Sequence, residues 1–299
     1  MTHISKAINS DAKPAGVRLA VELRSDSIDL AVGGGGHCAT HRLDVGGPPS
    51  WCEALRDWTQ RHNCRGAVVD IVLQASDYRL ARVQRPRVAQ EELGHAVRWL
   101  LRDYDPAVLE ESEFQVFEEP ASRSGEACVY VAMATRSGLA NLADTMAAAG
   151  LRLGSIRIPE LVLARLGSRL GEGAQALLFA RRRELRVIVC ADSAYYAGRC
   201  VPMAVDAAAA QANDILEARE GVRSLLAYCQ DRYAIGPCSL WYAAEPGAAE
   251  FARALAEGLD PPAQALPMAS AACMATPRDP EFVDVGLPAA SALQEWAHA

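Results

Sequence analysis

The chain has 299 residues, of which 51% are hydrophobic, and this is enough to bury a sizeable core in one large domain or two lobes. Its formal net charge is -7, an acidic balance that does not favour nucleic acid or an anionic membrane surface as a partner. No apolar run approaches the ~20 residues of a membrane-spanning helix, so direct membrane insertion is not expected.

The chain begins with a polar stretch, 1–16, that we expect to be a flexible leader without the features of a signal peptide. The nine cysteines are odd in number and form no Cys-x-x-Cys pair. Because several of them fall within apolar strands, we expect reduced thiols that pack in the core of a cytosolic protein, and no metal site.

Three strands, a helix and a fourth strand are predicted in the first quarter of the chain. A tight turn at Ser25 and Asp26 joins the first two strands, and a run of four glycines turns the chain into the third. A helix follows Pro48, where Ser50 and Glu53 have the spacing of a capping box. The strands are expected at 17–24, 27–33, 37–44 and 67–73.

The middle of the chain mixes helices and strands. Apolar residues recur at helical spacing after Pro86, and strand-like runs follow on either side of a polar loop. A second helix is expected to stop at Gly150, and a third to start at Pro159. The first two helices are predicted at 88–104 and 136–150, and the strands at 113–119 and 127–134.

The second half repeats the opening order of three strands, a helix and a strand. The two copies share this order and not their residues, so the repeat concerns architecture alone. The strands are expected at 176–182, 184–191, 194–201 and 238–244, with helix 204–233 before the last of them.

This repeat predicts an α/β protein with the actin-like ATPase fold, in which two ribonuclease-H-like lobes face each other across a cleft. We expect the first lobe at 17–165, with an inserted subdomain at about 78–134, and the second at 166–299. A generic α/β protein whose hairpins happen to alternate with helices fits the same pattern.

Short motifs give little chemistry. The glycine run 33–36 lacks the Gly-Lys-Ser/Thr of a P-loop and the last glycine of a dinucleotide fingerprint, so a hairpin turn explains it. His37, Cys38 and His41 are not spaced for easy metal binding on a strand. Glu91, Glu92 and His95 lack the HExxH pattern, and the run Arg181–Arg183 is either a solvated turn or a grip for an anion.

The stretch 78–104 and the stretch 151–166 carry a resemblance to a known family. The chain resembles the MshI family of type IV pilus biogenesis proteins, which is similar to PilM and to the cytoplasmic part of GspL of type II secretion. The likeness spans about residues 15–290. It implies an actin-like fold with an inserted subdomain. The matching residues are Tyr78, Leu80, Val83, Pro86, Val88, Glu92, Leu93, Ala96, Trp99 and Asp103.

The resemblance also implies where a nucleotide would bind. PilM-type proteins carry Asp-x-Gly at the first and second hairpin turns, where a carboxylate holds hydrated Mg²⁺ and glycine admits the phosphates, and Gly-Gly near the adenine. Here these positions carry Glu22-Leu23-Arg24, Phe179-Ala180-Arg181 and Ala243-Ala244-Glu245-Pro246. Arg199 matches an arginine that the family carries after the second hairpin.

These positions are degenerate, because Arg24 replaces one glycine and Arg181 another. Loss of one well-placed electrostatic group commonly costs a few kcal/mol of transition-state stabilisation, so we expect neither catalytic residues nor Mg-ATP hydrolysis. Binding of ATP and Mg²⁺ is disfavoured, although guanidinium groups such as those of Arg24 and Arg181 can hold phosphate.

The expected function is that of a cytoplasmic scaffold, peripheral to the inner membrane through its partners. It would bind the short cytoplasmic N-terminal peptide of a PilN-like or MshJ-like inner-membrane protein, and contact the pilus assembly motor or its accessory proteins. PilM-like proteins hold this peptide between the first lobe and its inserted subdomain. The candidate peptide-binding residues are Tyr78, Leu80, Pro86, Leu93 and Trp99, with ordinary core packing as the alternative for each.

Two other functions fit parts of the pattern. An active actin-like ATPase or small-molecule kinase would bind Mg-ATP between the lobes, and it would need the two acid-glycine turns that are degenerate here. A soluble actin-like protein with no part in pilus assembly is the third reading.

Overall fold

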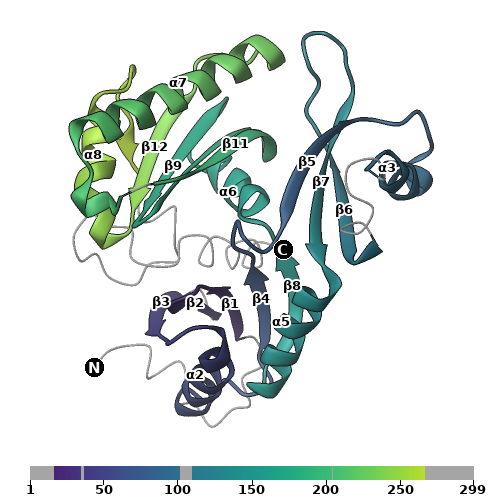
Figure 1. Cartoon of the computed structure of the whole chain (residues 1–299), viewed down its shortest axis with the longest axis vertical. Coiled ribbons are helices and arrows are strands. Elements are labelled where there is room, and N and C mark those ends of the chain that lie inside the picture. Colours follow the sequence, from purple (N-terminus) through teal and green to yellow (C-terminus); the bar gives the residue numbers. More distant parts are fainter. Residues whose placement is uncertain (1–16, 35–36, 102–109, 204, 267–299) are drawn as a thin grey trace.

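The computed structural model describes residues 17–34, 37–101, 110–203 and 205–266. These residues form two lobes, each built on one β-sheet, and a smaller inserted sheet at the side (Figure 1). The expected leader at 1–16 lies outside the described residues.

The first lobe contains a five-stranded mixed sheet in the order β3-β2-β1-β4-β8. The first three strands are antiparallel neighbours, and β4 and β8 join parallel to β1. The predicted strands of this lobe are confirmed, and β8 is one that the sequence pattern did not predict. The strands are β1 Arg18–Leu23, β2 Ser27–Gly34, β3 His37–Asp44, β4 Val68–Val72 and β8 Arg152–Arg157.

Helices α2 (Pro48–Arg61) and α5 (Arg136–Ala148) cover one face of this sheet. Leu55 and Trp58 of α2 and Met146 of α5 pack against alternate strand residues, which include Val21 and Leu30. Because side chains alternate along a strand, their neighbours in sequence point to the opposite face. We call that opposite face, which lies toward the second lobe, the inner face of the first lobe.

Helix α2 begins at Pro48, so the capping box predicted at Ser50 and Glu53 is wrong. The N-cap residue is Gly47, whose φ of 116° is accessible to glycine and rarely to other residues. A proline with a fixed φ suits the first helical turn, where its missing N–H is not needed. Gly47 and Pro48 therefore set the helix start three residues earlier than the capping pattern indicates.

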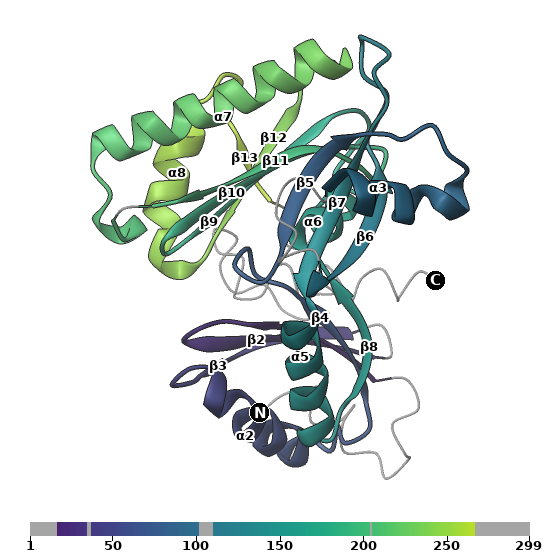
Figure 2. The same cartoon turned by 45° about the vertical axis from the view of Figure 1, so that its right-hand side comes forward.

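The inserted subdomain is a three-stranded antiparallel sheet in the order β5-β7-β6. Helix α3 packs on one face through Leu93, Val97 and Leu101. Figure 2 shows α3 on the outer side of this sheet. The elements are β5 Arg79–Gln84, the short 3-10 helix Gln90–Glu92, α3 Leu93–Leu101, β6 Ser112–Glu118 and β7 Cys128–Thr135.

The second lobe repeats the strand order of the first as β11-β10-β9-β12-β13. This repeated order, with its inserted subdomain, confirms the predicted α/β, actin-like fold. None of the helices in the described part of the chain is long and apolar enough to cross a membrane. The strands are β9 Gln175–Arg181, β10 Glu184–Ala191, β11 Ala194–Pro202, β12 Ser239–Ala244 and β13 Gln264–Ala265.

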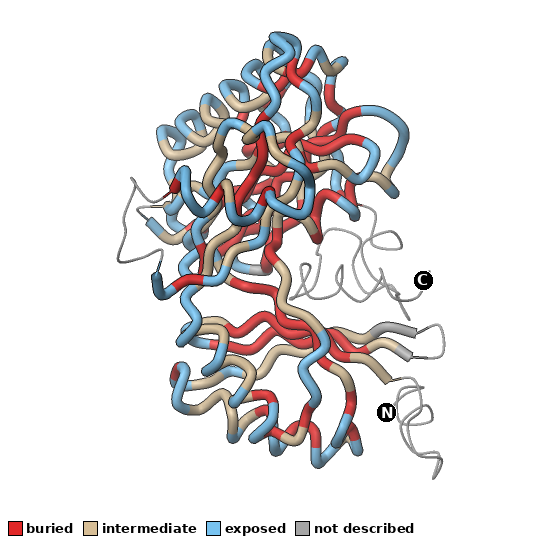
Figure 3. The backbone as a smooth tube through the Cα atoms, turned by 90° about the vertical axis from the view of Figure 1, so that its right-hand side faces the viewer, coloured by how far each residue is buried: buried red, intermediate tan, exposed pale blue. Residues whose placement is uncertain are grey.

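Helices α7 (Ala212–Tyr233) and α8 (Ala249–Glu257) cover one face of the second sheet. Alternate residues of β9 and β10, such as Leu178 and Val187, point into this core. The sequence pattern did not predict α8 or β13. Figure 3 shows that the strands of both lobes are largely buried.

Helix α6 (Pro159–Gly167) follows the last strand of the first lobe but packs on the second lobe. Its Leu163 and Leu166 contact Leu177 and Ile188 on the face opposite to α7 and α8. We call this face the inner face of the second lobe. The expected lobe boundary after residue 165 therefore falls inside a helix that belongs, by packing, to the second lobe.

The inserted subdomain is attached to the second lobe through a buried carboxylate. Glu119, just after β6, pairs with Arg82 of β5 at 2.6 Å and with Arg232 of α7 at 3.2 Å. It also accepts a hydrogen bond from the Tyr233 hydroxyl. Beside it, the Tyr130 hydroxyl of β7 donates to the carbonyl of Tyr196 in β11 at 2.5 Å.

We predict that Gly167→Ala destabilises the protein, because a Cβ on Gly167 would lie 2.2 Å from Cys190 Sγ. Forcing extra atoms into a packed core commonly costs about 1–3 kcal/mol. Chemical denaturation of the variant measures this loss as a lower free energy of unfolding.

The matched control is Cys190→Ala, which removes the sulfur. In the double variant the added methyl group has room, so its loss of stability should be smaller than the sum of the two single losses. Additive losses would contradict the close packing of α6 on β10.

Candidate functional site

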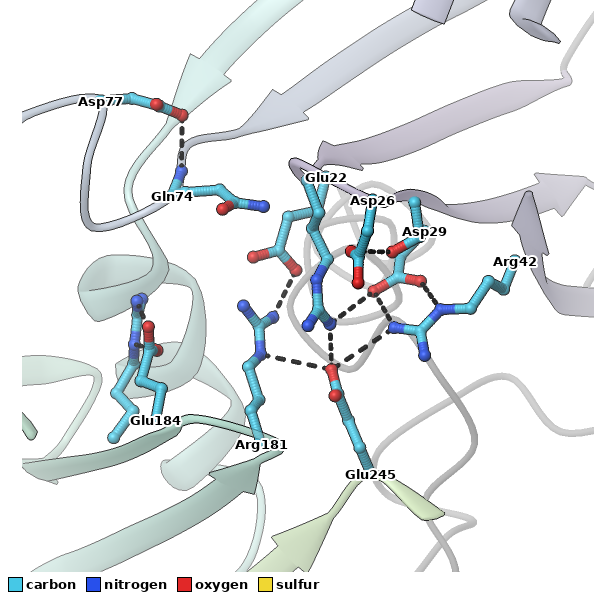
Figure 4. A network of polar contacts seen from close by, with 12 residues as sticks. Glu22, Asp26, Asp29, Arg42, Gln74, Asp77, Arg181, Glu184 and Glu245 are labelled. Carbon is cyan, nitrogen blue, oxygen red and sulfur yellow. Dashed lines mark hydrogen bonds and ion pairs between the residues drawn. The ribbon is translucent and has the colours of Figure 1, made fainter. Parts of the chain in front are cut away.

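Six charged residues meet where the inner face of the first lobe approaches the second (Figure 4). Glu22 of β1, Asp29 of β2 and Arg42 of β3 are cross-strand neighbours, so their side chains form one row. Arg181 ends β9 and Glu245 follows β12, two adjacent parallel strands of the second lobe. With Arg24, these five residues form what we call the interlobe charge cluster.

The turn between β1 and β2 positions Arg24 in this cluster. The backbone N–H of Arg24 donates to the carbonyl of Ser27 at 2.8 Å, which closes the turn. The Trp51 indole of α2 donates to the carbonyl of Arg24 at 3.0 Å and fixes it from the other side.

The contact between the lobes is an ion pair of Glu22 and Arg181. Arg181 Nη2 donates to Glu22 Oε2 at 2.5 Å, and both residues are buried, at 0% and 5% exposure. Figure 4 shows the two side chains pointing toward each other from opposite lobes. A buried charge is tolerated in a protein when a partner of opposite sign neutralises it.

Glu245 joins three arginines. Its Oε1 accepts from Arg24 Nη1, lies 3.4 Å from Arg42 Nη2 and lies 3.6 Å from Arg181 Nε. Arg24 and Arg42 come from the first lobe and Arg181 from the second, so this single carboxylate also ties the two lobes together.

Asp29 is held by a two-point contact with Arg42. Arg42 Nε donates to Oδ1 at 2.8 Å, and Arg42 Nη2 donates to Oδ2 at 3.0 Å. Burial raises the pKa of Asp29, an effect that Arg42 opposes. Three carboxylates and three guanidinium groups make the cluster neutral as a whole.

The pKa values of the arginines reflect this pairing. Burial alone would lower the pKa of Arg181, but the adjacent Glu22 carboxylate outweighs it and the pKa is raised. The same balance holds for Arg24, where burial is outweighed by Glu245. Both arginines therefore stay charged, and each is already matched by a carboxylate of this chain.

This arrangement is poorly suited to Mg-ATP. The carboxylate that would hold hydrated Mg²⁺, that of Glu22, has one oxygen engaged by Arg181. Its other oxygen, Oε1, is buried without a hydrogen-bond partner among the described residues. The guanidinium groups that could grip phosphate are paired with Glu22 and Glu245, so a nucleotide would have to displace these carboxylates first.

The structure brings together three of the four degenerate nucleotide positions expected from the sequence. Glu22, Arg24 and Arg181 lie in the interlobe charge cluster. Arg199 does not: it is exposed on β11, and its guanidinium lies beside Gly221 of α7. The other two arginines of the 181–183 run are exposed, and Arg182 pairs with Asp206.

Sequence reasoning missed Asp29 and Arg42 and treated Glu245 only as a lost glycine. Side chains two residues apart on a strand point to the same face. Counted outward from the turn between β1 and β2, this rule would have placed Asp29 on the same face as Glu22, its cross-strand neighbour. The position of Arg42 follows only once the register of β2 against β3 is known. Glu245 could not be connected to the others, because its partners are distant in sequence.

The other polar motifs do not form a site. His41 is half-buried and packs against Trp58, a core residue of the first lobe, with ring centroids 5.5 Å apart. The side chains of His37 and Cys38 lie outside the described residues. Within the ranges that the structure describes, no group of His, Cys, Asp and Glu could hold a metal ion. The seven cysteines described there are free thiols.

The five candidate peptide-binding residues are spread over the subdomain and its junction with the lobes. Tyr78 is buried, and its hydroxyl donates to Glu160 Oε2 at 2.5 Å. Leu80 packs toward the cores of the two lobes, whereas Leu93, the first residue of α3, packs on the opposite face of the same sheet. Pro86 is half-buried after β5.

Trp99 is the most exposed of the five, at 74% of its surface. It lies on α3, next to Leu100, which is 47% exposed. Leu80 and Leu93 therefore cannot line one groove, and Trp99 is the candidate whose indole lies at the surface.

No protein-family model matches the chain, and no curated protein matches it by sequence. Solved structures do resemble it. One chain of a structure described as the PilM-PilN type IV pilus biogenesis complex matches with a TM-score of 0.63 and 17% identity, over 83% of this chain and 88% of that chain.

The cytoplasmic domain of EpsL, an inner-membrane component of the type II secretion system of Vibrio cholerae, also matches. The TM-score is 0.55, the identity 18%, and 95% of each chain is covered. At these identities the likenesses show a shared fold.

We predict that Arg181→Met lowers the free energy of unfolding by about 3–5 kcal/mol, because Glu22 then stays buried without its partner. Removing that charge as well, in Glu22→Leu/Arg181→Met, should recover at least about 1 kcal/mol. Urea unfolding curves of both variants measure these differences.

Arg182→Met is the matched control, since Arg182 is adjacent, exposed and paired only at the surface. It should change stability by no more than about 0.5 kcal/mol. Equal losses in the free energy of unfolding for Arg181→Met and Arg182→Met would show that the interlobe ion pair stabilises the protein no more than a surface pair does.

Proposed function

We propose that this chain is a non-catalytic docking protein of a type IV pilus assembly platform. The observation that carries the proposal is the interlobe charge cluster, in which Arg181 pairs with both Glu22 and Glu245 where an actin-like ATPase would bind its nucleotide. The chain shares its fold with a chain of the PilM-PilN complex and with the EpsL cytoplasmic domain, and this likeness supports a role in a pilus or secretion assembly.

The proposed partner is the cytoplasmic N-terminal peptide of an inner-membrane protein of the PilN or MshJ type. The likeness to a chain of the PilM-PilN complex supports this choice. Such a partner would hold the chain in the cytoplasm beside the inner membrane. The closer kinship that we propose is with MshI, on the residues of 78–104 and 151–166.

The proposed binding region is the boundary between the inserted subdomain and the first lobe. An extended peptide can add to a free sheet edge while its alternate side chains enter pockets. β6 and β5 are edge strands of the inserted sheet, and β8 is an edge strand of the first lobe, among the described strands. We take Trp99 of α3 as the apolar anchor, because its indole is the most exposed large apolar side chain of the described residues.

We predict that a synthetic peptide of the partner's cytoplasmic N-terminus binds the full chain, as measured by fluorescence polarisation. Trp99→Ala should weaken binding about tenfold or more, because exposed aromatic anchors commonly dominate such interfaces. Absence of binding at high micromolar concentration would count against the proposed function.

Leu216→Ala is the matched control, since Leu216 is also an exposed apolar residue (55%) but lies on α7 of the second lobe. Its affinity for the peptide should equal that of the unaltered chain. Equal losses in the two variants would place the peptide elsewhere.

We predict that millimolar Mg-ATP shifts the melting temperature by less than about 1 °C, because the charge cluster already occupies the phosphate positions. A ligand present at 100 times its dissociation constant would add about 2.7 kcal/mol of stability. Mg²⁺ without nucleotide is the control. A shift of several degrees, together with phosphate release, would instead support the ATPase or kinase alternative.

A further inference from the structure

Four exposed arginines lie at the end of the first lobe that is remote from the second lobe. At this end α5 stops and β8 begins (Figure 1, Figure 2). The arginines come from α2, from the turn after it and from the first residue of β8, and they belong neither to the interlobe charge cluster nor to the inserted subdomain. We call them the basic end of the first lobe: Arg56, Arg61, Arg65 and Arg152.

Arg65 and Arg152 meet at the turn between α5 and β8. Arg152 Nε donates to the carbonyl of Gly66 at 2.9 Å, and the N–H of Gly66 donates to the carbonyl of Gly150 at 2.7 Å. Arg65 lies against the same turn, because a Cβ built on Gly150 would be 3.4 Å from Arg65 Nε. Two guanidinium groups are therefore held at one place on the surface.

Arg56 and Arg61 extend the basic end along α2. Arg56 Nε donates to the carbonyl of Ala148, at the end of α5, at 3.1 Å. Arg61 Nε donates to the carbonyl of Asp57 at 3.2 Å. Both bonds use the inner nitrogen of the guanidinium, as the bond of Arg152 does. The outer nitrogens, which form the two-pronged end that binds carboxylate or phosphate, are not used in these bonds.

Capping of helix ends explains part of this arrangement. Arginines commonly donate to the carbonyl groups that a helix leaves open at its C-terminus. Other exposed arginines, such as Arg136 and Arg182, pair with carboxylates of this chain. None of the four arginines of the basic end forms such a pair within the part of the chain that the structure describes. Capping does not account for this local excess of positive charge.

The basic end is opposite in sign to the protein as a whole. Asp57 is the acidic residue of 54–67 and 145–153, the two stretches that contain the four arginines. The whole chain carries a net charge of -7. That total, which does not favour an anionic partner, therefore does not describe this end. An anionic surface would be attracted here and repelled by the remainder, so it would bind the protein in one orientation.

The composition of this end favours a surface of anionic groups over a protein partner. Protein interfaces are commonly centred on exposed aromatic or large apolar side chains. Among the large apolar side chains exposed in the described ranges, only Leu153, at 38%, lies at the basic end. A bilayer with anionic headgroups needs no such centre, because each basic side chain beside it adds to the attraction.

We propose that the basic end of the first lobe binds the anionic phospholipid headgroups of a membrane surface. Its guanidinium groups match the headgroup phosphates in charge and in their planar, two-point geometry. The contact is electrostatic and inserts no helix. That this membrane is the inner membrane rests on the proposed function, whereas the site itself does not. The second lobe would then point away from the bilayer, since the basic end lies opposite to it.

The experiment is co-sedimentation of the full chain with vesicles of phosphatidylglycerol and phosphatidylethanolamine at low salt. The chain should bind these vesicles and not vesicles of phosphatidylcholine, and sodium chloride should weaken binding because it screens exposed charges. Arg61→Gln/Arg65→Gln should weaken binding about tenfold or more, since one basic side chain beside an anionic surface contributes about fivefold. Arg61→Lys/Arg65→Lys keeps the charge and should keep most of the binding.

Arg199→Gln/Arg223→Gln is the matched control, since both arginines are exposed on the second lobe and the change in net charge is the same. It should bind the vesicles as the unaltered chain does. Equal losses in the two glutamine variants would overturn the inference, as would absence of binding to the anionic vesicles. Binding to polyglutamate but to no vesicle would assign the basic end to an acidic polypeptide and would also overturn it.

The two proposals fail separately. Vesicle binding is measured without the partner's peptide, and peptide binding is measured by polarisation without vesicles. A chain that binds the vesicles and not the peptide would contradict the proposed function alone. A chain that binds the peptide and not the vesicles would contradict only the assignment of the basic end.

Discussion

A charged side chain that is buried away from water needs a partner of opposite charge, and in this protein Arg181 forms an ion pair with Glu22 across the boundary between two lobes. Each side chain belongs to a strand end that the core of its own lobe holds rigidly, so neither can follow the other without moving a whole sheet. Glu245 reinforces the contact by sharing its carboxylate among Arg24, Arg42 and Arg181. Opening the lobes would separate opposite charges in a dry environment, which is costly without a replacement partner.

The positions of this cluster give it a functional meaning. In the family that the chain resembles, the same two hairpin turns hold carboxylates and glycines around Mg²⁺ and phosphate. Here the positive charge of the metal ion has an internal counterpart in Arg181, and the negative charge of the phosphates has one in Glu245. In the function that we propose, the chain supplies from its own side chains the charges that a nucleotide and its metal ion would otherwise bring between the lobes. An exchange of this kind favours one fixed arrangement over a cycle of binding and release.

The sequence pattern predicted the three-stranded openings of both lobes, because continuous apolar strands and tight turns are local signals. It missed β8, where Arg152, Gly154 and Ser155 leave no apolar run, and it missed the short helix and strand after Glu245. The degenerate turns were identified from Glu22, Arg24 and Arg181. Their mutual pairing was not, since the partners are separated by more than 150 residues and only the packing of the lobes brings them together. Arg199 followed from family resemblance alone, and the structure places it beside α7.

The attachment of the inserted subdomain has a mechanical consequence. It is encoded within the first lobe, but Glu119 secures it to Arg232 and Tyr233 of the second. The sheet of the first lobe ends at β8 and does not continue into the inserted sheet. The boundary between the first lobe and the subdomain is therefore bridged by connecting chain and side-chain packing, and not by strand pairing. Any twisting of one lobe against the other would therefore slide the subdomain along the first lobe. A peptide bound at that boundary would resist this sliding, and it would thereby restrict the rotation of one lobe against the other.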